Sequence, residues 1–282
     1  MCSKTKPKVF KFKLSTFYLL YNQSMNKMNV AIITGASSGF GKEFVKLLVK
    51  DNSLDKIFAL ARNEEKLNDL KLEFGDKIQP YSVDLSNVEN IKNFGKFLET
   101  QNVNIKILIN NAGFAKFCSY EDISVEESVN MINLNISGVV VMGLICIPFM
   151  ENGSHIINIA SQAAFQPVPY QNIYSATKSF VKNYSQALNI ELKEKGITVT
   201  AVCPGWMKTD LYSRGCINAP KGTKNFVFMA EPDVVAKKAL KDAYNNKDIS
   251  VYGFYVNMCR ILSKILPEKL IMKIWLLQQG IK

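Results

Sequence analysis

Three side chains in one stretch of the chain carry groups suited to proton transfer: Ser161, Tyr174 and Lys178. A tyrosine and a lysine four residues apart on a helix project from the same face. An ammonium group beside a phenol favours the phenolate, so we expect Lys178 to lower the pKa of Tyr174. This spacing is also common on solvated helix faces. With Ser161 placed to hold a substrate oxygen, it indicates a tyrosine general acid or base.

A glycine-rich turn lies near the start of the sequence. The apolar residues 30–33 predict a buried parallel strand, and the apolar positions of 44–48 predict an amphipathic helix behind the turn. Glycines stand at 35, 39 and 41, where backbone N–H groups could approach a pyrophosphate. Their spacing, GxxxGxG, differs from the commoner GxGxxG, and a turn without a ligand is the alternative.

The glycine-rich turn followed by the Ser-Tyr-Lys set resembles the motifs of the short-chain dehydrogenase/reductase family, classical type. The resemblance covers residues 30–252. The resemblance implies a catalytic tetrad of Asn135, Ser161, Tyr174 and Lys178. In that tetrad Tyr174 exchanges a proton with a carbonyl or alcohol oxygen, which Ser161 orients. Lys178 lowers the tyrosine pKa and holds the nicotinamide ribose. Asn135 fixes a water linked to the lysine, although it could instead simply cap or kink a helix.

The resemblance also implies a dinucleotide site. Residues 34–41 resemble the TGxxxGxG of the family, Asp84 its adenine-contacting acid, residues 110–113 its NNAG and residues 204–209 its PGxxxT. The implied cofactor contacts are Thr34, Gly35, Ser37, Ser38, Gly39, Phe40, Gly41, Arg62, Asp84, Leu85, Asn111, Ala112, Gly113, Tyr174, Lys178, Pro204, Gly205 and Thr209.

Arg62 bears on the choice of cofactor. Proteins that bind NAD usually place an acid about 20 residues beyond the glycine turn. Here no carboxylate occurs in that region before Glu64. Because a guanidinium pairs well with phosphate, Arg62 favours NADP over NAD. A solvated arginine at the start of a helix is the alternative.

Strand-like and helix-like segments alternate along the sequence. This pattern predicts one α/β domain, a Rossmann-like doubly wound parallel sheet of about seven strands with helices on both faces. After the first strand, the expected strands are 56–61, 78–83, 106–110, 154–160, 197–203 and 249–252. The expected helices are 39–50, 63–74, 86–99, 123–150, 170–195 and 231–246.

The net charge of +11 lies mainly at the two ends of the chain. Residues 1–28 carry +6 and residues 254–282 carry +4, which leaves +1 for residues 29–253. A nearly neutral central domain is a poor footprint for nucleic acid, so we expect no nucleic-acid partner. The lone His155 has no partners spaced for a metal, and we expect no metal site.

The six cysteines show no CxxC pairing, which favours free thiols and a cytoplasmic location. A peripheral association of the protein with a membrane is the other option. No segment has about 20 uninterrupted apolar residues, as a spanning helix needs. The basic leader, 1–28, is expected to be disordered or not native, ahead of a membrane-associating leader or a signal peptide.

The C-terminal segment 254–282 predicts two short amphipathic helices, with Pro267 in the first turn of the second. These helices either pack on the domain or on a second subunit, which we favour, or lie on a membrane through their basic residues.

The expected function is NADP-dependent reduction of a carbonyl, or oxidation of the matching alcohol. Residues 206–228 correspond to the substrate lid of the family, and its aromatics, with Phe165, Val168 and Pro169, suggest an apolar substrate. Lipid-like ketones, β-ketoacyl groups, steroids and small aldehydes all remain open. A homo-oligomer, dimer or tetramer, is expected. The alternative function is a non-catalytic NADP-binding sensor or scaffold, which the complete tetrad disfavours.

Overall fold

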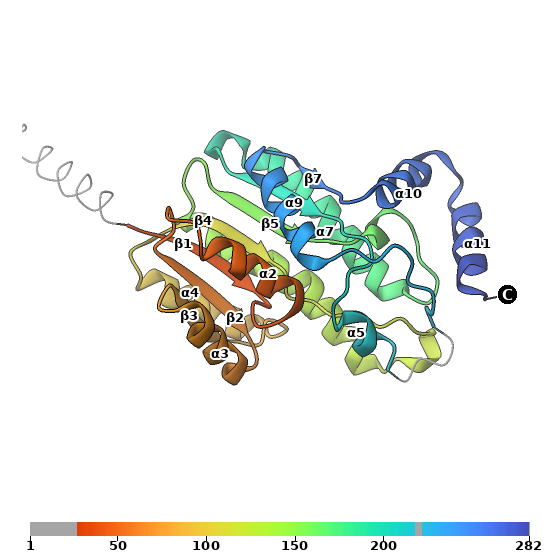
Figure 1. Ribbon diagram of the computed structural model, residues 1–282, viewed down its shortest axis with the longest axis horizontal. Coiled ribbons are helices and arrows are strands. Elements are labelled where there is room, and N and C mark those ends of the chain that lie inside the picture. Colours follow the sequence, from red (N-terminus) through yellow and green to blue (C-terminus); the bar gives the residue numbers. More distant parts are fainter. Residues whose placement is uncertain (1–26, 218–221, 282) are drawn as a thin grey trace, which may run out of the picture.

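A seven-stranded, all-parallel sheet forms the centre of the computed structural model, which describes residues 27–217 and 222–281 (Figure 1). Its strand order is β3-β2-β1-β4-β5-β6-β7, so the chain winds outward from β1 in both directions. The expectation for residues 1–26 lies outside the described residues. The strands are β1 (Met28–Thr34), β2 (Lys56–Ala61), β3 (Ile78–Ser82), β4 (Val103–Asn110), β5 (His155–Ile159), β6 (Thr198–Val202) and β7 (Ile249–Ser250).

Helices connect the strands, and their positions confirm the doubly wound fold expected from the sequence. The α-helices are α2 (Gly39–Leu48), α3 (Glu64–Phe74), α4 (Val88–Glu99), α5 (Val125–Ile132), α6 (Gly138–Cys146), α7 (Asn172–Glu191), α8 (Leu211–Gly215), α9 (Pro232–Tyr244), α10 (Phe254–Ile265) and α11 (Glu268–Gln279). Single turns of 3₁₀-helix are η1 (Tyr120–Asp122), η3 (Ile147–Phe149), η4 (Gln162–Phe165) and η5 (Lys193–Lys195).

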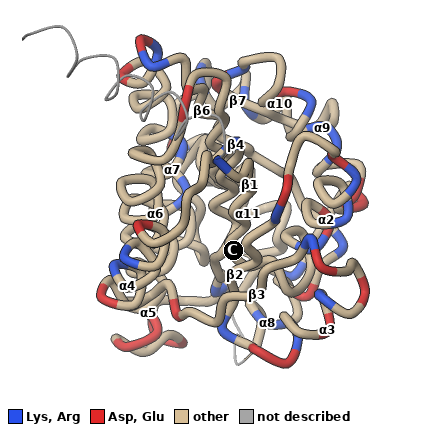
Figure 2. Tube along the Cα trace, turned by 90° about the vertical axis from the view of Figure 1, so that its left-hand side faces the viewer, with Lys and Arg blue, Asp and Glu red and all other residues tan. Residues whose placement is uncertain are grey.

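Each face of the sheet has its own hydrophobic core, because successive strand residues point to opposite faces. Ile33 and Ile57 pack with α2, α3 and α9, whereas Ile32 and Phe58 pack with α4, α6 and α7. Charged residues concentrate on the outer helices and loops (Figure 2). Two apolar layers around one sheet therefore hold the ends of its strands in fixed positions.

The helix predicted over 123–150 is continuous but changes its winding in the middle. Residues Asn133–Ser137 form a π-helical segment, η2, between α5 and α6. The whole run Val125–Phe149 is long and apolar enough to cross a membrane by length and composition, which the sequence reasoning had not anticipated. Met142 and Cys146 of this run lie in the core against the sheet. The π-segment places Asn135 in a fully buried position.

The two C-terminal helices lie at the right-hand edge of Figure 1 and pack on the domain through part of their surface. Val256 of α10 and Ile271 and Trp275 of α11 are buried. The indole Nε1 of Trp275 donates a hydrogen bond to the Pro169 carbonyl at 3.0 Å. Pro267 precedes α11 as its N-cap residue and does not stand inside its first turn. Other apolar residues of both helices stay exposed.

Candidate active site

A cleft of about 640 Å³ opens at the carboxyl ends of the strands, where a doubly wound sheet binds its ligands. Most of the residues expected to contact a cofactor line it. Thr34, Gly41 and Asn135 do not line it and lie behind its wall. The expected residues that line the cleft are Gly35, Ser37, Ser38, Gly39, Phe40, Arg62, Asp84, Leu85, Asn111, Ala112, Gly113, Ser161, Tyr174, Lys178, Pro204, Gly205 and Thr209.

Thr34, the last residue of β1, joins the glycine turn to the end of β4. Its Oγ1 accepts hydrogen bonds from the backbone N–H groups of Asn111 and Ala112, both at 2.9 Å. The amide of Asn111 donates in return to the carbonyls of Thr34 at 3.0 Å and Gly35 at 3.2 Å. These bonds fix the two loops that form the floor of the cleft.

Two glycines are required because other groups approach their backbone closely. Gly35 has a φ of +63°, and a Cβ there would lie 2.9 Å from the Asn111 Nδ2. A Cβ on Gly41 would lie only 2.1 Å from the Gly35 carbonyl oxygen. The N-cap residue of α2, Ser38, makes no side-chain capping bond to the first turn. The first backbone N–H groups of α2 therefore border the cleft, and this cradle fits a pyrophosphate.

The far end of the cleft carries two cations. Arg62 follows β2 and Lys66 stands one helical turn later in α3, which Asn63 caps by accepting from the Lys66 N–H at 2.8 Å. Asp84 faces the same end and holds Ser86, whose N–H and Oγ donate to its Oδ1. Sequence reasoning missed Lys66, although its place in the first turn of the helix that follows Arg62 was a usable signal.

Asn135 supports the site from beneath. Its Oδ1 accepts from the Phe114 N–H at 3.1 Å, and its Nδ2 donates to the Phe114 carbonyl at 3.0 Å and the Thr177 Oγ1 at 3.1 Å. A Cβ on Gly113 would lie 2.9 Å from Asn135 Oδ1 and 3.5 Å from Lys178 Nζ. The asparagine therefore ties the β4 loop to the helix that carries Tyr174 and Lys178.

The expected effect of Lys178 on Tyr174 is wrong for the protein without ligand. Burial raises the pKa of Tyr174 to about 12, opposed by its hydrogen bond with Ser161. Burial also lowers the pKa of Lys178 to about 8. The lysine Nζ donates to the Ile159 carbonyl at 2.7 Å and stands 5.8 Å from the tyrosine ring centroid. Desolvation of the phenol is thus the largest influence on its pKa.

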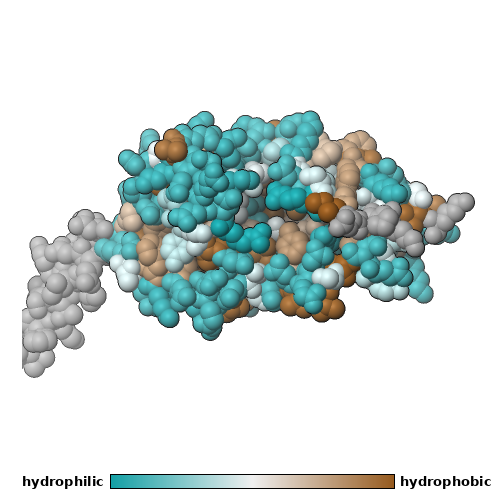
Figure 3. All heavy atoms as spheres, turned by 90° about the horizontal axis from the view of Figure 1, so that it is seen from below, coloured by the Kyte–Doolittle hydropathy of each residue, from teal (hydrophilic) through white to brown (hydrophobic). Residues whose placement is uncertain are grey.

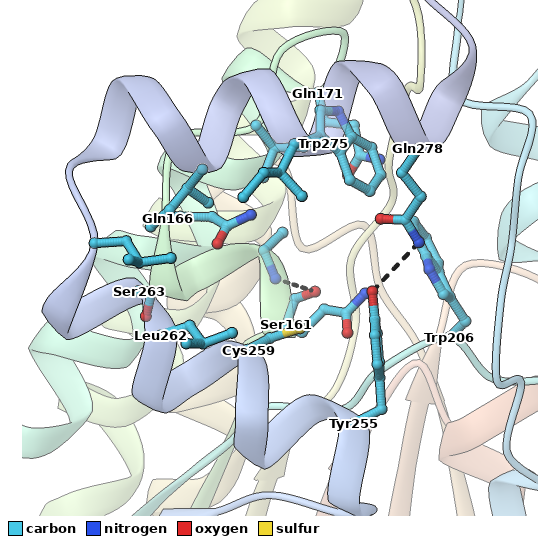
Figure 4. A pocket seen from close by; sticks show the side chains of 16 residues that line it. Ser161, Gln166, Gln171, Trp206, Tyr255, Cys259, Leu262, Ser263, Trp275 and Gln278 are labelled. Carbon is cyan, nitrogen blue, oxygen red and sulfur yellow. Dashed lines mark hydrogen bonds between the residues drawn. The ribbon is translucent and has the colours of Figure 1, made fainter.

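Ser161 follows β5 and starts η4, and its Oγ accepts from the Ala163 N–H at 3.1 Å. Its side chain lines the large cleft and also a second, smaller cavity of about 110 Å³, which lies between the Ser161 loop and the helices α10 and α11 (Figure 4). The serine therefore stands where the two spaces meet, and Tyr174 lines the large cleft beside it. Sequence reasoning found the serine but not the second cavity.

An aromatic cluster surrounds the tyrosine. Phe117 contacts Tyr174 edge to face with ring centroids 5.7 Å apart, and it also packs on Trp206, Tyr212 and Phe226. The last three belong to the segment 206–228 that the sequence marked as the substrate lid. Phe117 was missed because it stands in a loop without a repeating pattern. Val168 belongs to the same cluster, with Phe165 packed nearby.

No group of three or more potential metal-ligating side chains occurs within the described ranges 27–217 and 222–281. His155 packs edge to face on Tyr244 at 5.2 Å, and burial lowers its pKa. The five cysteines that the structure describes are free thiols.

Residues 29–215 match the short chain dehydrogenase family. The chain belongs to this family. It is 32% identical over 187 residues to an uncharacterized oxidoreductase of Staphylococcus epidermidis. The matched region covers 66% of this chain and 80% of that protein. The chain is thus an oxidoreductase of the short-chain dehydrogenase family.

Solved structures of the family share the fold but hold different cofactors. The closed form of serine dehydrogenase complexed with NADP⁺ has a TM-score of 0.68 and 28% identity, covering 79% of this chain and 94% of the other. The 3-ketoacyl-(acyl-carrier-protein) reductase from Brucella melitensis, complexed with NADH, has a TM-score of 0.66 and 27% identity, covering 79% and 95%. A nicotinamide dinucleotide is therefore the cofactor class of these structures, in both its phosphorylated and unphosphorylated forms.

Proposed function

We propose that this short-chain dehydrogenase reduces a carbonyl group on an apolar substrate with NADPH, or oxidises the matching secondary alcohol. The observation that carries the proposal is the meeting of Ser161, Tyr174 and Lys178 between a cleft that fits a dinucleotide and an aromatic cluster. The hydroxyl groups of Ser161 and Tyr174 can both bond to one substrate oxygen atom, and the Lys178 ammonium group lies beside them. Together they form a proton-transfer site.

Tyr174 acts as the general acid in this proposal. Its pKa of about 12 keeps the phenol protonated at neutral pH, so it can donate to a carbonyl oxygen that Ser161 also holds. The hydride that reduces the carbonyl carbon would come from NADPH when that cofactor is bound. The proton passes from Tyr174 Oη to the alcohol oxygen, and solvent then returns one to the tyrosine.

The preference for NADPH rests on charge at the far end of the cleft. Arg62 and Lys66 line this end together. A guanidinium and an ammonium group form charge-assisted hydrogen bonds with phosphate but gain little from a ribose hydroxyl. Asp84 also lines this end, but it is engaged with Ser86 and follows β3 instead of β2. The 2′-phosphate of NADPH is the group that matches these two cations.

A second candidate function is a non-catalytic NADP-binding sensor or scaffold. The two functions share the cleft and differ in the need for Tyr174 and Ser161. A sensor has no use for a buried phenol bonded to a serine beside an aromatic cluster. This arrangement favours the enzyme, which we place in the cytoplasm.

We further propose that two copies of the chain associate through the long helix run and α7. Val129, Ile132 and Leu144 on the run, with Phe180 and Ile190 on α7, are apolar and exposed. The same patch on a second copy would cover them by two-fold symmetry. Sedimentation of the purified chain should give twice the monomer mass, and a Leu144→Arg substitution should return it to monomer.

The outer surface of α10 and α11 is proposed to contact an anionic membrane. Phe254, Ile265 and Leu277 remain more than two-thirds exposed there. Residues 254–281 also carry a net charge of +3, which complements anionic headgroups. Hydrophobic colours are denser on the right-hand half of the lower face, the half on which these helices lie (Figure 3).

A panel of ketones and aldehydes, followed by the fall in NADPH absorbance, tests the proposed reaction. Turnover of at least one carbonyl compound is expected. If NADPH binds but no member of the panel is reduced, and no alcohol is oxidised with NADP⁺, the sensor is the better account.

A further inference from the structure

The second cavity lies between the Ser161 loop and the C-terminal helices (Figure 4). We propose that this cavity, named here the hairpin cavity, binds an uncharged aliphatic or alicyclic part of the substrate while the carbonyl group lies at Ser161 and Tyr174. The inference rests on the proposed function and adds the class of compound to it. It also makes α10 and α11 part of the substrate site.

The position of the cavity comes first. Ser161, Gln162 and Trp206 line both the cofactor cleft and the hairpin cavity. A substrate whose oxygen is held at Ser161 therefore has one neighbouring space filled by cofactor and the other open under the helices. Figure 4 shows Ser161 near the middle of this space, with α11 on one side and α10 on the other.

The chemistry of the walls decides the occupant. Among the described residues that line the hairpin cavity, none is charged. Its large apolar wall residues are Val168, Trp206, Leu262, Leu266, Ile271, Ile274 and Trp275, and its uncharged polar ones include Gln162, Gln166, Gln171 and Gln278. Bringing a charged group here would cost its hydration without an ionic partner in return. A hydrocarbon group would gain about fourfold in affinity for each methylene fully buried, the equivalent of roughly 0.8 kcal/mol.

Several polar groups that line the cavity are already bonded within the protein. The Gln171 amide donates to Thr223 Oγ1 at 2.9 Å, and the Gln278 amide to the Tyr255 hydroxyl at 3.3 Å. The Trp275 N–H is taken by the Pro169 carbonyl. These bonds leave the cavity with mostly apolar surface, and its polar groups near Ser161 are at the end where the carbonyl would lie.

The wall that α11 contributes to the hairpin cavity is fixed at the C-terminal end of this helix. The Gln279 Oε1 accepts from the N–H groups of Lys224 and Asn225 at 3.0 and 2.9 Å, and its Nε2 donates to the Asn225 carbonyl. Gln279 is only 4% exposed. Since α11 is bonded to the lid in this way, the hairpin cavity is a preformed space and needs no closure to exist.

A matched pair of substitutions tests the assignment. Ile274 lines the cavity and is 49% exposed, whereas Ile261 does not line it and is 59% exposed. Straight-chain 2-alkanones of increasing length should show kcat/KM values that rise with chain length in the wild type. Ile274→Phe should flatten this rise and Ile261→Phe should leave it unchanged. An equal rise in all three proteins, or none in the wild type, would overturn the assignment.

Binding can be followed without turnover, because Trp206 and Trp275 are the two tryptophans of the chain and both line the cavity. Titration with straight-chain 2-alkanols should change their fluorescence to saturation, more tightly for longer chains, and more weakly in Ile274→Phe. An alkanol with a terminal carboxylate should not compete. No saturable change would sink the cavity assignment alone. Saturation by the alkanols, with no NADPH oxidation by the matching 2-alkanones and no NADP⁺ reduction by the alkanols, would count against the proposed function alone.

Discussion

The cofactor cleft and the hairpin cavity meet at Ser161 but are built by different means. The cleft, about 640 Å³, is formed by backbone at the ends of parallel strands, and its shape depends on Gly35 and Gly41. The hairpin cavity, about 110 Å³, is formed by side chains on two helices that follow the last strand. One space uses polar backbone groups and cations, and the other uses apolar side chains without charge.

Because of this difference, the two regions tolerate different amino-acid substitutions. A backbone cradle tolerates few residue types, because an added Cβ collides with a carbonyl group or an amide. A wall of Leu, Ile and Trp accepts other apolar residues of similar volume at modest cost. The cofactor class is therefore built into the sheet, whereas the substrate is selected by the C-terminal helices.

The largest expected effect falls where the two regions meet. Tyr174→Phe removes the proton donor and should lower kcat by about a hundredfold to ten-thousandfold. Binding of NADPH and of 2-alkanols, measured by fluorescence, should change little because neither space is altered in shape. Wild-type activity in this variant would show that another group supplies the proton.

A change confined to the cleft should alter cofactor choice alone. Arg62→Asp should weaken NADPH binding by about ten- to a hundredfold, from the loss of roughly 1.5–3 kcal/mol of charge-assisted hydrogen bonding. NADH affinity should stay within a few-fold of the wild type, and the chain-length dependence should be unaffected. Lys66→Gln should act in the same direction with a smaller effect. The assignment fails if wild-type protein binds NADH as tightly as NADPH.

The pH dependence of kcat/KM tests the role of Lys178, which belongs to the tetrad and also lines the cleft. Because the pKa of Lys178 is lowered to about 8, its charge is present below pH 8 and is lost as the pH rises through this value. The kcat/KM for NADPH should be level from pH 6 to 7.5 and fall about tenfold per unit well above pH 8. Tyr174 stays protonated over this range. Lys178→Arg, which keeps its charge, should remove the fall; a fall retained by that variant would point to a different group.

The smallest effect is expected on the outer surface of the hairpin. Lys264→Gln should weaken binding to vesicles containing phosphatidylserine by about fivefold, since one basic residue contributes roughly 1 kcal/mol near an anionic surface. Lys237→Gln on α9 is the matched control and should have no effect. Co-sedimentation at low and high salt gives the measurement. If the wild-type protein does not sediment with vesicles at either salt concentration, the membrane contact is wrong.

The sequence predicted the sheet well, because its strands and helices depend on local patterns. The strand expected at 56–61 and the helix expected at 63–74 lie within one residue of β2 and α3. The glycines and Thr34 predict a turn whose geometry few other residues permit. These features are encoded by residues close together in the chain.

The hairpin cavity and the ionisation of Tyr174 could not be predicted in the same way. The amphipathic pattern of α10 and α11 showed that one face is apolar, but not that it would cover Ser161, about a hundred residues earlier. The pKa of Tyr174 depends on how deeply Phe117 and its neighbours bury it. Both properties arise from packing between distant segments, which no local spacing records.

The π-helical segment at Asn133–Ser137 limits how this part of the gene can change in length. Such a segment holds one more residue than an α-helix of the same rise. Deleting one residue there would let the run relax to regular α-helix while α5 and α6 kept nearly the same relative orientation, but the bulged residues would shift their positions around the helix. Asn135, which lies in this segment, would then lose the position from which it bonds to Phe114 and Thr177. Insertions and deletions are therefore expected to be tolerated in the lid loop but selected against in this helix.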